Sequence, residues 1–340
     1  MISFYKKAGL LLFIFTGFAS FIFTNSGFNC SKNKTGDQTP IIPAPPATGQ
    51  SPVSPVSIND TILNYKPSWQ IHYTALPVNK LKSLTPLYAK YGKKNVRLIL
   101  ALNRIDEKNF RRTDTLMVPD TVTNILSYSP YPYIIEAARQ IPKLILISCK
   151  LQAIAAYKDG ALVRWAPVST GRKSKPTPAG LFSMNWKSKE TTSTVDSSWV
   201  LPYYFNFNST GGVALHKFEL PGYPASHSCV RLLEEDAKWF FVWGEQWLIT
   251  RNRSLIAHGT PVIVFDEYPW DGRHPWRKML DNPQEASVSD NEIDVLMKKY
   301  LPEIKNRMNI RQAALAEIKL KYLQEQTAEV KEYPMTIIKR

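Results

Sequence analysis

Cysteine is scarce in this sequence, with only Cys30, Cys149 and Cys229 among 340 residues. Three cysteines cannot form a disulfide framework, and these three are too far apart along the chain to predict a metal cluster. We therefore expect neither a metal nor another cofactor. Cys149 ends the apolar run 144–149, which favours a buried strand residue without chemistry.

Acidic residues are too few to balance the basic ones. The chain has 28 Asp and Glu against 43 Lys and Arg, a formal net charge of +15. Such an excess favours association with polyanions, which include nucleic acid, anionic lipid and anionic wall polymers. A hydrophobic fraction of 44% excludes a disordered chain, and the length leads us to expect two folded units.

The first residues indicate export. Lys6 and Lys7 precede the uncharged apolar run 8–23, which is the arrangement of a secretory signal. This run is a little short for a membrane helix of about 20 residues, so a cleaved signal and an uncleaved anchor are both open. We expect residues 1–30 to tether the protein to the membrane in the cell envelope, or periplasm. An exported protein does not meet chromosomal DNA, so nucleic acid is not an expected partner.

Cys30 provides a third alternative for attachment. It follows the apolar run and precedes polar sequence, as the lipidated cysteine of a bacterial lipoprotein does. Residues 27–29 differ from those usually found before such a cysteine, so lipidation competes with a plain signal anchor. Residues 31–60 are rich in Pro, Thr, Ser and Gly, and they predict an extended linker of about 3.1 Å per residue.

Residues 78–120 form a separate segment. Apolar spacing predicts helices over 84–91 and 95–103, followed by a strand over 116–119. This order resembles a lysin motif, a small α/β module that binds peptidoglycan. An ordinary helical packing segment is the alternative interpretation.

Residues 143–266 predict a mainly β domain, because short apolar runs alternate with turn signals such as Asp159-Gly160. The expected strands are 144–148, 153–157, 162–169, 180–186, 213–215 and 261–265. A helix is expected over 233–244, just after Cys229.

The C-terminal extension, residues 280–332, interleaves charges of both signs and is predicted to be helical. Apolar residues recur in it at steps of three and four, at Ile304, Met308, Leu315, Ile318 and Tyr322. A helix lying against its own domain is the expectation, and a partner helix or self-association is the alternative.

The residues around Cys229 can supply cysteine chemistry, which needs a base, donors for an oxyanion and a handle for the substrate. His216 ends a short apolar strand and is a candidate general base or thiolate partner, although a lone histidine there is often structural. Arg231 can hold a carboxylate with its planar fork, with a structural ion pair as the alternative.

Cys229 itself is expected just before the predicted helix. There the helix dipole and free backbone N–H groups would lower the thiol pKa. The N–H groups of Ser228 and Cys229 would form the oxyanion hole. A buried inert cysteine is the alternative, but the polar residues Ser226, His227 and Ser228 before it argue against an apolar setting.

The segment resembles the L,D-transpeptidase catalytic domain, whose signature is a strand histidine followed by Ser/Thr-His-Gly-Cys and then an apolar residue and Arg or Asn. Residues 151–182 also resemble the entry strands of this family and its Ser-Thr-Gly … Thr-Pro-x-Gly-x-Phe turn. The resemblance covers about 143–266 and implies a β-sandwich-like fold.

The resemblance also implies a reaction. Cys229 would attack the L-to-D bond of a tetrapeptide stem of peptidoglycan, release D-Ala and pass the stem to an amine in wall cross-linking. His216 would be the base, and Ser226, His227 and Arg231 would support the pocket and the thiolate.

Two residues depart from the family pattern. Ser228 replaces the glycine before the nucleophile, and Lys217 replaces the glycine common after the first histidine. These changes put the loop geometry and the acceptor in doubt. A carboxypeptidase that uses water, and a peptidoglycan-binding protein with weak or no activity, are therefore alternatives. The sequence does not identify the group that orients His216.

Overall fold

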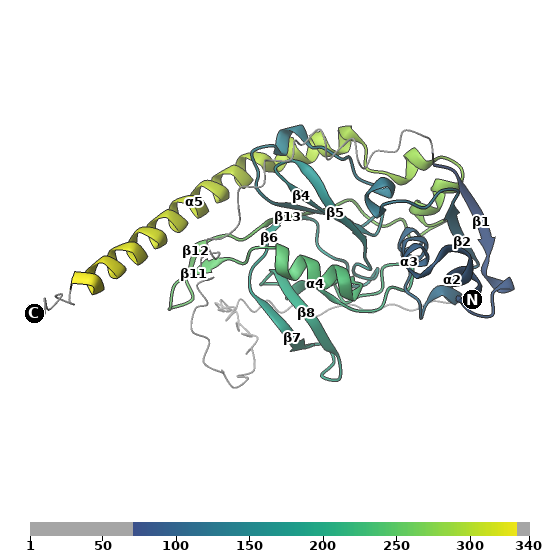
Figure 1. Cartoon of the computed structure of the whole chain (residues 1–340), viewed down its shortest axis with the longest axis horizontal. Coiled ribbons are helices and arrows are strands. Elements are labelled where there is room, and N and C mark those ends of the chain that lie inside the picture. Colours follow the sequence, from purple (N-terminus) through teal and green to yellow (C-terminus); the bar gives the residue numbers. More distant parts are fainter. Residues whose placement is uncertain (1–70, 332–340) are drawn as a thin grey trace, which may run out of the picture. The chain divides into compact units, whose positions relative to one another are not determined.

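The computed structural model describes residues 71–331, with side chains up to residue 324 (Figure 1). The predicted signal or anchor, Cys30 and the predicted linker lie outside the described residues. Within residues 71–331, no helix is both long and apolar enough to span a bilayer.

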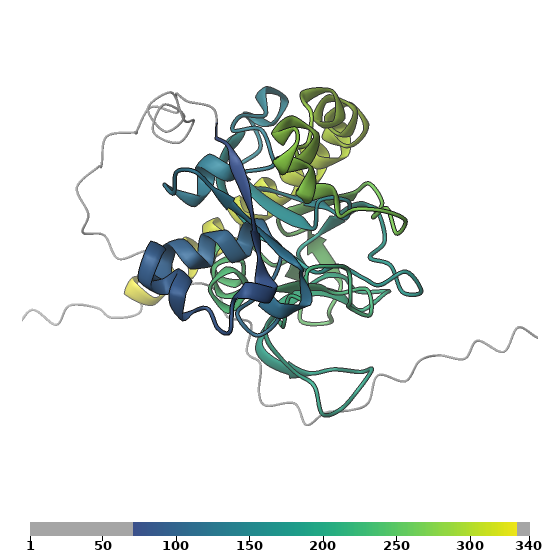
Figure 2. The same cartoon turned by 90° about the vertical axis from the view of Figure 1, so that its right-hand side faces the viewer.

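The first part of the described chain is a β-α-α-β module. Strand β1 (Tyr73–Pro77) pairs antiparallel with β2 (Thr115–Pro119), and α2 (Thr85–Tyr91) and α3 (Lys93–Leu102) lie between them in sequence. Figure 2 turns these elements, drawn in dark blue, toward the viewer. The two helices and β2 confirm the sequence prediction, whereas β1 was not predicted.

The module has a hydrophobic core of its own. Leu87 of α2, Val96 and Ile99 of α3 and Leu116 of β2 are buried in it. Asn103, directly after α3, joins the helix to the strand, because its side-chain amide donates to the Ile99 and Met117 carbonyls and accepts from the Met117 N–H. This asparagine therefore fixes the end of α3 against β2.

Two larger sheets follow. One has the strand order β5-β4-β3-β13-β6, and the other has the order β10-β9-β8-β7. The strands of the first are β3 (Leu144–Ser148), β4 (Ala153–Lys158), β5 (Ala161–Pro167), β6 (Gly180–Ser183) and β13 (Pro261–Phe265). Those of the second are β7 (Lys187–Thr192), β8 (Val200–Asn208), β9 (Val213–Lys217) and β10 (Val230–Leu232).

The remaining elements are a hairpin, two helices and short 3-10 turns. The hairpin consists of β11 (Leu248–Ile249) and β12 (Leu255–Ala257), and the helices are α4 (Glu234–Trp243) and α5 (Asp290–Lys331). The 3-10 turns are Val78–Lys80, Phe110–Arg112, Ile125–Tyr128, Glu136–Ala138, Pro275–Leu280 and Pro283–Ala286.

The five-stranded sheet is buried on both faces. Alternate residues such as Ile145 and Val264 pack with Phe205 and Leu215 of the other sheet and with α4. The opposite face packs against α5 and α3 through residues such as Leu146. Burial on both faces explains why the predicted strands of this sheet were almost wholly apolar. The mainly β character and the C-terminal helix agree with the sequence prediction.

The strands β7 and β8 were not predicted. Lys187–Thr192 is mostly polar, and β8 contains Pro202, so neither gave the expected alternation of apolar and polar residues. The two strands pair with each other from Lys187–Phe205 to Thr192–Val200. They form the hairpin drawn at the bottom of Figure 1.

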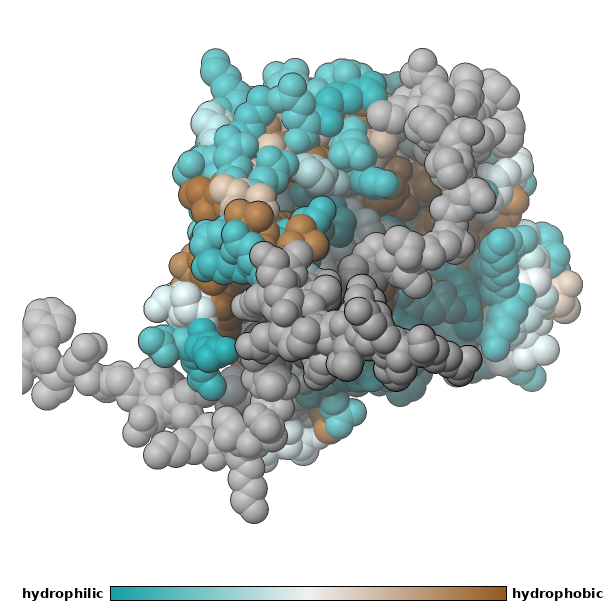
Figure 3. All heavy atoms as spheres, turned by 60° about the vertical axis from the view of Figure 1, so that its left-hand side comes forward, coloured by the Kyte–Doolittle hydropathy of each residue, from teal (hydrophilic) through white to brown (hydrophobic). Residues whose placement is uncertain are grey.

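The apolar stripe of the C-terminal helix packs only in its first part. Ile304 is buried against the domain, whereas Leu315, Ile318 and Tyr322 are exposed. Figure 1 shows α5 extending beyond the sheets. On the face shown in Figure 3, hydrophilic residues predominate and hydrophobic residues form separate patches. The expectation of a helix lying against its own domain therefore holds for the N-terminal part of α5.

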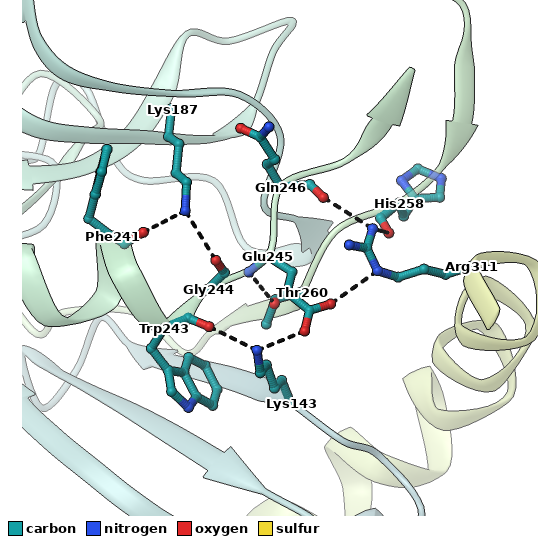
Figure 4. Close-up of polar contacts among 10 residues, drawn as sticks. All are labelled: Lys143, Lys187, Phe241, Trp243, Gly244, Glu245, Gln246, His258, Thr260 and Arg311. Atoms are coloured by element: carbon teal, nitrogen blue, oxygen red, sulfur yellow. Dashed lines mark hydrogen bonds and ion pairs between the residues drawn. The ribbon is translucent and has the colours of Figure 1, made fainter. Parts of the chain in front are cut away.

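A polar network fixes α5 to the end of α4 (Figure 4). Glu245 bridges Lys143 at 2.7 Å and Arg311 of α5 at 3.1 Å. Lys143 also donates to the Trp243 carbonyl and Lys187 to the Phe241 carbonyl, so two cations satisfy carbonyls at the C-terminus of α4. Arg311 donates in addition to the backbone carbonyls of Gln246 and His258.

Replacing Arg311 should weaken this attachment. Its side chain is only 16% exposed and makes charge-assisted hydrogen bonds, so Arg311→Ala should lower the free energy of unfolding by about 2 kcal/mol. The matched control is Lys321→Ala, because the Lys321–Glu317 pair is exposed and should contribute at most about 0.5 kcal/mol. Urea denaturation of both variants checks the difference, and equal stabilities would contradict the role of the network.

Candidate functional site

The site is built on the parallel pair of β9 and β10. In their register Leu215 lies opposite Val230, and His216 lies opposite Arg231. Leu215 and Val230 are buried in the core between the sheets. Since side chains alternate along a strand, His216 and Arg231 project from the opposite face, and Cys229, directly before β10, projects with them. The structure thus places Cys229, His216 and Arg231 on one face of two adjacent strands.

Cys229 is partly exposed on this face. Its Sγ lies 3.7 Å from the carbonyl oxygen of Gly212, and the Ala214 backbone N–H donates to the sulfur. Burial raises the pKa of the thiol, while the Ala214 N–H and the charge of Arg231 act in the opposite direction. The thiol is therefore protonated at neutral pH in the free protein.

The predicted helix after Cys229 is present, but the expectation that its N-terminus acts directly on the thiol is wrong. Val230–Leu232 forms β10, and α4 begins only at Glu234. The three residues after the cysteine pair with β9 rather than forming the first turn of the helix. The dipole of α4 consequently does not lower the pKa of Cys229.

His216 is buried, with 4% of its surface exposed. Its Nδ1 lies 3.0 Å from the backbone carbonyl oxygen of Lys217, which can only accept, so Nδ1 carries the proton and Nε2 is the free acceptor. Burial, together with the charge of Arg231 and against the Lys217 carbonyl, lowers the pKa of His216 to about 4. The imidazole is therefore neutral. The group that orients it is a backbone carbonyl, which no sequence motif reveals.

Ser228 adopts the conformation of a glycine, with φ 85°. The Thr177 hydroxyl donates to the Ser228 carbonyl at 2.8 Å and accepts from the Gly171 N–H at 2.9 Å. In a trans peptide the Cys229 N–H points away from the Ser228 carbonyl, so Thr177 also fixes the direction of this N–H. This hydrogen bond connects the two motifs that the sequence analysis found separately, and sequence reasoning did not single out Thr177.

Ser226 has a supporting position. It is 2% exposed, and its hydroxyl donates to the Cys229 carbonyl. Its backbone bonds Thr170 and Arg172, which attaches the cysteine loop to the turn at Gly171. A Cβ on Gly171 would lie 2.2 Å from the Lys175 carbonyl, so only glycine fits there. Ser226 therefore holds the loop and does not face the thiol with its hydroxyl.

His227 and Arg231 lie among aromatic rings. His227 packs 5.5 Å from Trp199, and the Arg231 guanidinium lies 4.6 Å from the Phe218 ring. Arg231 has no ion pair among residues 71–324, so a carboxylate handle is chemically available. Trp199 directly precedes β8, and neither Trp199 nor Phe218 was predicted, because nothing in the sequence pairs them with Cys229.

Cys149 is 6% exposed and packs in the core between the sheets. Burial raises the pKa of its thiol to about 12. The interpretation of Cys149 as a buried residue is confirmed. Within the described part of the chain, no cluster of three or more His, Cys, Asp or Glu side chains has the arrangement of a metal site.

Comparison with known proteins gives one family match. Residues 142–264 match the family model of the L,D-transpeptidase catalytic domain (YkuD). No curated protein matches the sequence.

Solved L,D-transpeptidase structures align with part of the chain. One from Stackebrandtia nassauensis is 25% identical, with a TM-score of 0.31, and the alignment covers 38% of this chain and 57% of that chain. One from Mycobacterium smegmatis is 20% identical, with a TM-score of 0.30 and coverages of 37% and 59%. One from Xylanimonas cellulosilytica is 26% identical, with a TM-score of 0.30 and coverages of 36% and 60%. The chain thus spans less than two thirds of the length of each.

Replacing Ser228 by glycine should stabilise the protein. A side chain at φ 85° is strained, so Ser228→Gly should raise the free energy of unfolding by about 1 kcal/mol. Ser174→Gly is the control, because Ser174 lies in the neighbouring loop without a positive φ and should lose about 0.5 kcal/mol. Chemical denaturation measures both, and a loss of stability in Ser228→Gly would contradict the strained geometry.

Proposed function

We propose, starting from the match of residues 142–264 to the family model of the L,D-transpeptidase catalytic domain, that this protein is a cysteine-dependent acyltransferase of peptidoglycan. The supporting observation is the common face of Cys229 and His216, with the histidine oriented by the Lys217 carbonyl. The donor is a tetrapeptide stem, and the bond attacked joins its L and D residues. The acceptor is an amine of another stem or of an envelope protein.

In the first step the Cys229 sulfur attacks the carbonyl carbon and its proton passes to Nε2 of His216. Because the thiol and the imidazole are both neutral, the proton moves while the sulfur attacks. A thiolate formed before the attack is disfavoured. The oxyanion is held by the Ser228 and Cys229 N–H groups, the latter directed by Thr177.

The intermediate then breaks. The C–N bond cleaves as His216 returns the proton to the leaving amine of D-Ala, and the stem remains as a thioester on Cys229. In the second step the acceptor amine attacks the thioester, gives a proton to His216 and forms the new amide. The Cys229 sulfur leaves and regains the proton. Arg231, which lies over Phe218 and has no ion pair within residues 71–324, holds a carboxylate of the donor.

Two other functions of the same site are open. Water in place of the amine makes the protein an L,D-carboxypeptidase. A peptidoglycan-binding protein with weak activity is favoured by the raised thiol pKa. Under this proposal the protein works in the cell envelope, exported and attached by residues 1–30, either as an anchor or through lipid on Cys30.

The β-α-α-β module supports binding to the wall. Its paired strands β1 and β2, the two helices between them and its own core are compatible with the lysin motif that the sequence resembles. Together with the linker, such a module would hold the catalytic domain at the glycan strands.

Acylation by a carbapenem tests the nucleophile. Incubation should add one carbapenem to the wild-type protein and to Cys149→Ala, and should add none to Cys229→Ala, in intact-protein mass spectrometry. His216→Gln should slow acylation about 100-fold, because the proton acceptor is lost. An unchanged adduct in Cys229→Ala would refute the assignment.

Turnover of purified muropeptides separates the reactions. Release of D-Ala with cross-linked product indicates the transpeptidase, and release without it indicates the carboxypeptidase. Binding to sacculi with no release of D-Ala would favour the peptidoglycan-binding protein.

A further inference from the structure

We propose that a basic and aromatic pocket beside the catalytic loop binds the sugar end of the substrate, a saccharide ring that carries the stem peptide. The pocket has a volume of about 550 Å³ and is lined by Arg172, Lys173, Tyr223 and Trp270 among others. This inference rests on the proposed function, because it names the part of the substrate that lies beyond the stem.

The pocket is attached to the catalytic loop by backbone hydrogen bonds. The Arg172 N–H donates to the Ser226 carbonyl at 2.9 Å. The Ser169 hydroxyl donates to the Tyr223 carbonyl at 2.7 Å and accepts from the Ala225 N–H at 3.1 Å. The contacts that hold the loop before Cys229 therefore also hold two walls of the pocket.

The charge of the pocket is not compensated. The side chains of Arg172, Lys173 and Lys175 make no hydrogen bond or ion pair with any described side chain or backbone group. Burial, and after it the charges of Arg172, Arg231 and Lys175, lower the pKa of His227. The field of these cations therefore reaches the catalytic loop. Hydroxyl and carbonyl oxygens of the saccharide are the acceptors that the substrate would present to these donors.

Two aromatic rings accompany these cations. Tyr223 is 39% exposed and Trp270 is 38% exposed. Trp270 is held at its edge by Tyr268, with ring centroids 4.9 Å apart. An exposed ring face offers an apolar surface to the C–H face of a sugar, and the nearby cations can donate hydrogen bonds to its hydroxyl and carbonyl oxygens.

The length of chain between the pocket and Cys229 is compatible with a saccharide in the pocket. Ala225, in the wall of the pocket, is four residues before Cys229, so the two lie at most about 14 Å apart. Three stem residues separate the sugar from the attacked carbonyl, and an extended tripeptide spans about 10 Å. A sugar can therefore lie in the pocket while the L-to-D bond lies at the sulfur.

Nucleic acid is the competing ligand, because bases also stack on aromatic rings beside basic groups. The position of the pocket favours the glycan. Its wall continues directly into Ser226 and Cys229, so its ligand is fixed relative to the nucleophile.

The test uses full-length protein with Cys229→Ala, so that binding is measured without turnover. Calorimetry compares the disaccharide-tetrapeptide with the free tetrapeptide. The sugar-bearing ligand should bind about tenfold more tightly, which corresponds to about 1.4 kcal/mol. Adding Lys173→Glu and Trp270→Ala should reduce this preference to less than about twofold and leave tetrapeptide affinity unchanged. Lys158→Glu, an exposed lysine at the end of β4, is the control and should retain the preference.

Equal loss of affinity for both ligands, or no loss for either, would overturn the inference. Binding of a single-stranded oligonucleotide that requires Lys173 and Trp270, without any preference for the disaccharide, would also overturn it. Thermal unfolding of each variant verifies that it is folded. Absence of carbapenem acylation in the wild-type protein would count against the proposed function alone, since the binding comparison does not depend on it.

Discussion

The parallel pairing of β9 with β10 is the contact on which the site depends. It places His216 opposite Arg231 and sets Cys229 on the same face, while the alternate residues Leu215 and Val230 enter the core. A shift of β10 by one residue in this register would turn Cys229 into the core, away from the face that carries His216. The burial of the apolar side chains therefore also fixes the position of the chemical groups.

A second constraint acts on the loop before the cysteine. Thr177 bonds both the Gly171 N–H and the Ser228 carbonyl, so the Ser-Thr-Gly turn and the nucleophile loop form one unit. The positive φ at Ser228 persists because these contacts hold the loop on both sides. The protein thus keeps the backbone shape of a glycine where a serine stands, which preserves the orientation of the N–H groups.

Much of the fold could be predicted from patterns. Strands such as Leu144–Ser148 and Pro261–Phe265 are continuous apolar runs, and Lys93–Leu102 and Glu234–Trp243 have helical spacing. The sequence also brought Cys229 and His216 together as candidates through their motif. It did not predict β10, because the three residues Val230–Leu232 directly before a helix do not differ from its first turn until their partner strand is known. The Lys217 carbonyl escaped because a backbone contact leaves no mark in residue type. Thr177 stood in the quoted turn motif, but the sequence does not show that its hydroxyl reaches the Ser228 carbonyl.

The central claim is that Cys229 and His216 are both neutral until substrate arrives, and alkylation of Cys229 measured against pH tests it most directly. Iodoacetamide labelling of the wild-type protein, followed at the Cys229 peptide by mass spectrometry, gives the rate at each pH. The account predicts a rate that rises in one step with a midpoint above about 8.5, the ordinary thiol value. A plateau of full reactivity between pH 5 and 7, the mark of a preformed thiolate and imidazolium pair, would contradict it.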